Sequence, residues 1–147
     1  MMCKGDKMIR DFKAEDIEKI MKLWLDTNVS AHSFIENAYW NDNYEAVKEM
    51  LPQAKLFVVE QDGKLQGFIG LNQSYIAGIF VAEDSQSQGI GKQLLDYVKS
   101  KHKELSLQVY QKNERAVRFY LREGFTIILK QVDDNTGEAE LVMKWIK

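Results

Sequence analysis

The sequence has very few of the residues that build disulfide frameworks or metal sites. Cys3 is the only cysteine, so no disulfide can form within the chain. The two histidines, His32 and His102, are too few for a histidine-rich zinc centre. We therefore expect no metal at the functional site. One unpaired cysteine suits a reducing compartment, which favours a cytoplasmic protein.

Long apolar runs and basic tracts are also missing. No stretch approaches the roughly 20 apolar residues that span a bilayer, and the N-terminus lacks the apolar segment of a signal peptide. The net charge is −2 with acids and bases interleaved, whereas a DNA-binding protein usually carries a basic face. We expect no membrane and no nucleic acid among the partners. A mildly acidic surface is compatible with a cationic acceptor such as an amine.

What the chain does contain suits one globular domain. It has 147 residues, of which 45% are hydrophobic and 29% are charged, enough for a real core. Regular patterning begins at Met8. The sequence therefore predicts one domain over residues 8–147, with residues 1–7 as a flexible lead-in.

Hydrophobic periodicity predicts an alternation of strands and helices. Helices are expected over residues 14–28, 38–51, 88–102 and 114–123. Strands are expected over residues 8–12, 56–60, 65–72, 75–81, 105–110, 125–131 and 139–146, with Asp62-Gly63 as a hairpin turn. This order, meandering strands followed by one βαβ crossover, predicts an α/β protein with a mixed sheet covered by helices.

One loop has the features of a phosphate site. The apolar strand residues 79–81 lead into a polar loop with Gly89 and Gly91, and that loop opens a helix. Free amides at a helix N-terminus bind anions, and the glycines let a ligand approach the backbone. Lys92 adds a positive charge, so a pyrophosphate is the natural ligand. Gln93 does not supply the hydroxyl of a Walker loop, and a dinucleotide fingerprint needs a third glycine. The alternative is that the two glycines serve only the backbone transition from the loop to the helix and bind no ligand.

A second run makes the interpretation specific. The segment 113–125 reads Asn-x-x-Ala-x-x-Phe-Tyr-x-x-x-Gly-Phe, and it follows Gln-x-x-Gly-x-Gly at 86–91. Together they resemble the two central motifs of the GNAT superfamily of N-acetyltransferases. His32, Phe34, Trp40 and the segment 109–113 resemble a small bacterial branch that includes protein-lysine acetyltransferases. The family often has arginine where this chain has Gln86, which leaves pyrophosphate binding to backbone amides.

The resemblance implies a GNAT-type acyl-CoA N-acyltransferase fold, with a seven-stranded mixed sheet, splayed central parallel strands and four helices. It implies acetyl-CoA as the cofactor, with its pantetheine arm in the gap between the splayed strands. Gly78 is expected near a β-bulge whose backbone N–H meets the thioester carbonyl. The residues expected at the cofactor are Ile79, Phe80, Val81, Gln86, Ser87, Gln88, Gly89, Ile90, Gly91, Lys92, Asn113, Ala116, Phe119 and Tyr120.

Catalysis requires an acid for the departing thiolate and a base for the acceptor ammonium. Tyr120 matches the family's general acid, although a core aromatic is the alternative. His32 is a candidate general base because imidazole titrates in the useful range. A glutamate (Glu36, Glu60 or Glu83) or a chain of waters could serve instead. The residues expected to wall the acceptor site, or else simply to pack in the core, are His32, Phe34, Tyr39, Trp40, Tyr75 and Tyr110.

The sequence thus predicts an N-acetyltransferase that moves an acetyl group to a primary amine by direct attack in a ternary complex. A protein lysine or N-terminal amine is the favoured acceptor, because no dense acidic cluster marks a polycation pocket. A polyamine or antibiotic acetyltransferase is one alternative. A non-catalytic acyl-CoA-binding module is another, although such a module would not need Tyr120. Either a monomer or a homodimer fits the sequence.

Overall fold

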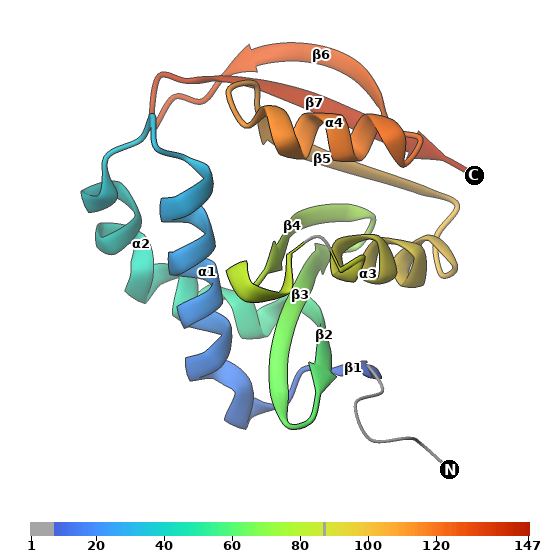
Figure 1. Ribbon diagram of the computed structural model, residues 1–147. Helices are drawn as coiled ribbons and strands as arrows, with labels where there is room; N and C mark the ends of the chain where they lie inside the picture. The colour runs from blue at the N-terminus through green and yellow to red at the C-terminus, as the bar shows by residue number, and fades with distance from the viewer. Residues whose placement is uncertain (1–7, 87) are drawn as a thin grey trace.

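The computed structural model describes residues 8–86 and 88–147. The expectations for Cys3, for the lead-in 1–7 and for Ser87 lie outside these residues. The described chain forms a seven-stranded sheet with the strand order β1-β2-β3-β4-β5-β7-β6 (Figure 1). The strands are β1 (Met8–Asp11), β2 (Lys55–Gln61), β3 (Lys64–Asn72), β4 (Tyr75–Val81), β5 (Glu104–Tyr110), β6 (Thr126–Val132) and β7 (Ala139–Ile146).

The sheet is mixed, as the sequence predicted. β4 and β5 are parallel, while every other pair of neighbouring strands is antiparallel. The tight connection between β2 and β3 is the expected hairpin turn, with positive φ at both Asp62 (53°) and Gly63 (79°). Positive φ at both central residues is the signature of a type I′ turn, whose twist matches that of the strands.

The helices agree with the expected ones in number but differ at their ends. They are α1 (Ile17–Ala31), α2 (Asn37–Met50), α3 (Ile90–Lys99) and α4 (Glu114–Arg122), with short 3₁₀ turns at Ala14–Asp16, Leu51–Gln53 and Glu83–Ser85. No helix in the described segments is both long enough and apolar enough to cross a membrane.

Three helix boundaries correct the sequence prediction. α1 continues to Ala31, three residues beyond the predicted end, so His32 is its C-cap. α3 begins at Ile90 instead of residue 88, because Gly89 has a left-handed φ of 77° and forms the N-cap. α3 also ends at Lys99, where the apolar face that packs on the sheet stops.

The helices cover the two faces of the sheet. α3 and α4 pack on one face, around a core that includes Leu94, Leu107 and Met143. α1 and α2 belong to a second core with Trp24, Trp40 and other residues, on the opposite side of β2 and β3. In Figure 1 the strands β5, β7 and β6 turn away from the N-terminal strands. The sheet therefore divides into an N-terminal half, β1 to β4, and a C-terminal half, β5 to β7, with different directions.

The divergence of β4 and β5 opens a gap in the middle of the sheet. In the described chain these strands pair only at Tyr75–Ser106 and Ile76–Leu107. The register between β3 and β4 shifts after Gly70, and Ala77 is the extra residue of the bulge. This confirms the predicted splay and puts a bulge next to Gly78. A Cβ at Gly78 would lie 2.5 Å from the ring of Phe80, so any larger residue there would require that ring to move.

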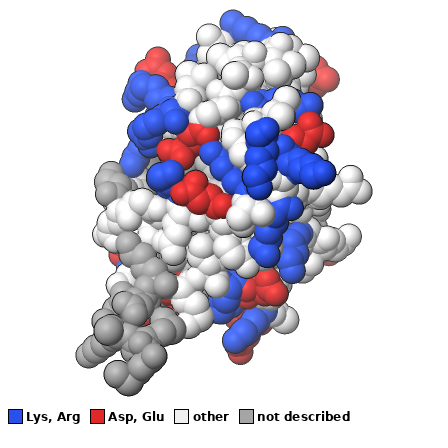
Figure 2. Space-filling model, turned by 90° about the vertical axis from the view of Figure 1, so that its right-hand side faces the viewer, with Lys and Arg blue, Asp and Glu red and all other residues white. Residues whose placement is uncertain are grey.

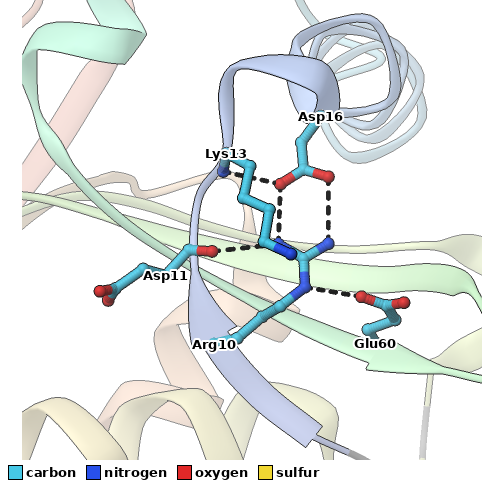
Figure 3. Close-up of polar contacts among 5 residues, drawn as sticks. All are labelled: Arg10, Asp11, Lys13, Asp16 and Glu60. Atoms are coloured by element: carbon cyan, nitrogen blue, oxygen red, sulfur yellow. Dashed lines mark hydrogen bonds and ion pairs between the residues drawn. The ribbon is translucent and has the colours of Figure 1, made fainter.

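A part-buried ion pair attaches β1 to the start of α1 (Figure 3). The Arg10 guanidinium donates to both carboxylate oxygens of Asp16, at 2.8 and 3.0 Å, and to Glu60 of β2 at 2.6 Å. Asp16 also accepts from the backbone N–H of Lys13 at 2.8 Å. These donors lower the pKa of the Asp16 carboxyl, first through the hydrogen bond from Arg10. The side chain of Asp16 is almost fully buried, so its charge depends on these partners.

We expect Asp16→Asn to lower the free energy of unfolding at pH 7 by about 2 kcal/mol, because it removes charged hydrogen bonds from a buried position. The exposed Lys22–Asp26 pair supplies a control, and Asp26→Asn should cost less than about 0.5 kcal/mol. Denaturant unfolding measures both values. Equal losses in the two variants would contradict the assigned importance of Asp16.

The same ion pair gives a pH dependence of stability. Because the folded-state pKa of Asp16 is lowered, its contribution is complete above the unfolded pKa of about 3.9 and is lost as the pH falls through the folded value. Wild type should therefore lose stability below about pH 4 more steeply than Asp16→Asn. If the free energy of unfolding fell equally steeply below about pH 4 in wild type and in Asp16→Asn, this linkage would be wrong.

Candidate active site

A groove of about 910 Å³ lies where β4 and β5 diverge. Helix α1, strand β4, the N-terminus of α3 and helix α4 all contribute to its walls. Most of the residues expected at the cofactor line this groove. They are Ile79, Val81, Gln86, Gly89, Ile90, Gly91, Lys92, Asn113, Ala116, Phe119 and Tyr120.

The N-terminus of α3 provides the anion-binding end of the groove. Gly89 takes the left-handed N-cap conformation, and helix geometry leaves the N–H groups that follow it without intrahelical acceptors. A Cβ added to Gly91 would lie 3.5 Å from the Phe119 ring and would narrow the space between α3 and α4. The glycines therefore keep both the backbone amides and the space beside them accessible, which fits a pyrophosphate.

Basic side chains surround this end of the groove. The Arg115 guanidinium donates to Gln86 Oε1 at 2.6 Å, and Gln86 Nε2 donates to the Val81 carbonyl at 3.2 Å. A cation from α4 thus reaches the loop position at which the family often has arginine. The groove-lining cations are Lys92, Lys112, Arg115, Arg118 and Arg122.

These cations lie among carboxylates. Lys92 Nζ lies 3.1 Å from both Asp96 and Glu123. Figure 2 views the side of the molecule where α3 and α4 end, and there the Lys and Arg side chains lie beside Asp and Glu. The local field at the groove is positive without a large patch of one sign, which suits a small anionic ligand better than a nucleic acid.

Two of the expected cofactor residues point elsewhere. Strand alternation turns the side chain of Phe80 to the face opposite Ile79 and Val81, where it stacks on Phe68 with ring centroids 4.7 Å apart. Gln88 Nε2 donates to the Asp84 carbonyl at 3.4 Å and is not among the lining residues. A contact between Phe80 and the ligand would therefore have to use its backbone.

Tyr120 lies at the inner part of the groove, on α4. Its side chain is 8% exposed and packs edge-on against Phe119 and Phe125, with centroids 5.3 and 5.5 Å away. Burial raises the pKa of its phenol, and Tyr75 raises it further. The hydroxyl is consequently protonated at neutral pH and able to donate a proton.

His32 belongs to an aromatic cluster beside the groove. Its ring stacks on Trp40 at 5.3 Å and lies edge-on to Phe34 at 5.6 Å and to Tyr110 at 5.2 Å. Burial lowers the pKa of the imidazole, so it is neutral at pH 7. The structure thus brings together five of the predicted acceptor-site residues, because Tyr39 also lies edge-on to Trp40 at 4.9 Å. Tyr75, at the start of β4, is close enough to Tyr120 to raise the pKa of its phenol.

A contact between His32 and Asn113 connects this cluster to the groove. Asn113 Oδ1 accepts the N–H of Ala116 at 3.3 Å and caps α4, so its Nδ2 faces His32 Nε2, also at 3.3 Å. In this arrangement Nε2 is the acceptor and carries no proton. Of the glutamate alternatives for the general base, Glu60 of β2 already accepts a hydrogen bond from Arg10 of β1.

The sequence analysis missed two groups of groove residues. Thr27, Ser30 and Ala31 line the groove from the last turns of α1. The predicted helix contained Thr27 but ended before Ser30 and Ala31. The arginines of α4 at 115, 118 and 122 recur at helical spacing, and that periodicity was a signal that one face of the helix is basic.

Comparison with known proteins agrees with this geometry. The family model described as "Acetyltransferase (GNAT) domain" matches residues 10–146. The peptidyl-lysine N-acetyltransferase YiaC of Escherichia coli K12 is 38% identical over 140 residues, which cover 94% of this chain and 96% of that protein.

Solved structures share the fold. The solution structure of apo YjaB from Escherichia coli superposes with a TM-score of 0.85 at 26% identity, covering 95% of this chain and 97% of that one. The PaiA N-acetyltransferase of Thermoplasma acidophilum, solved in complex with coenzyme A, gives a TM-score of 0.78 at 18% identity, with 97% and 99% covered. The chain therefore belongs to the GNAT acetyltransferase family and is an acetyl-CoA-dependent N-acetyltransferase.

Proposed function

We propose that this enzyme acetylates the ε-amine of lysine side chains in proteins, with both substrates bound at once. The observation that carries the proposal is the similarity to YiaC over nearly the full length of both chains. The aromatic cluster of His32, Phe34, Trp40 and Tyr110 supports it, because aromatic faces bind the stem and the cation of a lysine.

The groove residues have distinct roles in this proposal. Acetyl-CoA supplies the acetyl thioester. The amides at the N-terminus of α3 hold its pyrophosphate, with positive charge from Arg115 and Lys92 beside them. The backbone of Ile79 and Val81 offers its unpaired strand edge to the pantetheine arm, because β5 has already diverged at that point.

Two groups act on the reacting atoms. The backbone N–H at Gly78, beside the bulge, donates to the carbonyl oxygen as negative charge develops on it. The Tyr120 hydroxyl protonates the sulfur that leaves. Its raised pKa keeps the phenol protonated at neutral pH, so a proton is available when negative charge develops on the sulfur. His32 stays a candidate base, although its Nε2 faces Asn113.

An acceptor screen tests the proposed substrate class. Lysine-containing peptides, peptides with only a free N-terminal amine, and polyamines are compared by the rate of CoA release. We expect the highest kcat/KM for the lysine peptides, with the acetyl group on Nε by mass spectrometry. Faster turnover of a polyamine, or no acetylation of any peptide, would contradict the proposal.

For Tyr120→Phe we expect kcat to fall about 100-fold, since the departing thiolate loses its proton donor. The phenylalanine keeps the contacts with Phe119 and Phe125, so the KM for acetyl-CoA and the melting temperature should stay the same. Tyr97→Phe, at an α3 tyrosine that packs on Phe57, is the matched control. Unchanged kcat in Tyr120→Phe would remove the acid role.

A further inference from the structure

Glu140, at the start of β7, is a half-buried carboxylate with no cation paired to it among residues 8–86 and 88–147. Its printed hydrogen bond comes from a neutral group, Gln131 Nε2 of β6, at 2.8 Å. A carboxylate that is partly removed from water favours a cationic partner. Residues 8–86 and 88–147 do not provide that partner.

The register of the sheet fixes the direction of this carboxylate. Glu140 lies opposite Tyr110 on β5 and opposite Gln131 on β6. Residues directly opposite in an antiparallel pair share one face of the sheet. Val109 and Leu141, which alternate with them, are buried against α3 and α4. Glu140 therefore faces away from α4, toward the side where Tyr110 contacts His32 and Phe34.

Tyrosines from three elements surround this position. The charge of Glu140 contributes to the raised pKa of Tyr75 on β4 and of Tyr39 on α2, after the larger effect of burial. Tyr110 lies opposite it on β5. These phenols keep their protons at neutral pH, and Asp133 adds a second negative charge that acts on Tyr39.

Tyr75 connects the surroundings of Glu140 with Tyr120, the proposed acid. It lies opposite Ser106 where β4 and β5 are still paired, just before the gap opens. Its phenol also influences Tyr120, whose pKa it helps to raise. The charge of Glu140 thus acts on Tyr75, and Tyr75 in turn acts on Tyr120.

Asp133 does not compete for the same cation. It accepts the Tyr110 hydroxyl at 2.5 Å and the backbone N–H of Asn135 at 3.0 Å. These bonds hold the Tyr110 ring in place beside the His32 cluster. Asp133 is therefore held by two donors, whereas the hydrogen bond described for Glu140 is the one from Gln131.

We propose that Glu140 binds the ammonium group of the acceptor and takes its proton, which makes it a catalytic residue of the transfer. The inference rests on the proposed amine acceptor and deepens it. A carboxylate with tyrosine rings beside it is a site for a primary ammonium on a flexible stem, such as a lysine side chain.

The proton count is balanced. One ammonium proton passes to the Glu140 carboxylate, so that the nitrogen lone pair forms the new bond to the acetyl carbon. The carbon–sulfur bond breaks, and Tyr120 gives its proton to the sulfur. The second proton lost by the nitrogen restores the Tyr120 phenol, and Glu140 releases its proton to water. Nothing is oxidised or reduced.

The decisive variant is Glu140→Gln, which keeps the shape and can still bond to Gln131. We expect kcat/KM for a lysine peptide at pH 7 to fall about 100-fold, with the KM for acetyl-CoA unchanged. Glu104→Gln is the control, because it removes the same charge from the far end of β5, where Glu104 pairs with Lys144. It should retain full activity, and both variants should melt like wild type.

A pH series separates the catalytic role from a structural one. Lysine has an unperturbed pKa of about 10.4, so near pH 10 much of the acceptor is already neutral and needs no base. The groups that face Glu140 are Tyr39, Tyr75, Tyr110, Gln131 and Asp133, and the three tyrosines have raised pKa values. The defect of Glu140→Gln should therefore shrink between pH 7 and pH 10. An equal defect at both pH values, or none, would overturn the proposal.

A binding measurement keeps this inference distinct from the lysine-acceptor proposal. Nα-acetyl-lysine amide is titrated into the ¹⁵N-labelled protein with CoA, and the Gln131 side-chain amide reports on Glu140. We expect that signal to shift in wild type and to stay in place in Glu140→Gln. If wild type shows the shift but acetylates no peptide, only the proposed substrate is wrong. If wild type shows no shift, the assignment of Glu140 fails.

Discussion

The divergence of β4 from β5 is the constraint on which the rest of the structure depends. Two paired positions hold the strands together, and beyond Ile76 their facing edges separate. Each strand then has backbone N–H and C=O groups that lack a neighbour, which is costly unless a ligand or water satisfies them. The gap therefore creates a site for an extended polar arm, and the bulge at Ala77 lies beside Gly78 where the gap begins.

The gap also separates two chemically different sides. The groove side has the α3 amides and the α4 cations, which suit the phosphates of the cofactor. The opposite side of β5 and β7 carries Tyr110 and Glu140, which suit a cation. Tyr120 is buried and lines the groove, which is where the proposed acid for the leaving sulfur has to lie. In the proposed reaction, these opposite charge preferences favour the anionic cofactor on one side and the cationic acceptor on the other.

Much of the fold and of the cofactor site could be predicted from local patterns. The alternation of apolar residues located all seven strands and four helices, because each element must bury one face. The family could be identified from the two glycines of the loop and from the motif over residues 113–125. Most of the cofactor residues that this resemblance implied line the groove. The ends of the helices were harder to predict. Helix α1 continues to Ala31, because tertiary packing and not composition sets its length.

The sequence by itself determined the elements, the anion-binding loop and the family, since these follow from periodicity and from residues close together in the chain. The tertiary structure decided what lies beside them. Arg115 reaches Gln86 across 29 positions, and His32 meets Asn113 across 81. Glu140 faces Tyr110 only because β7 inserts between β5 and β6. Strand order and register are set by long-range packing, and no local pattern in the chain records which distant side chains they bring together.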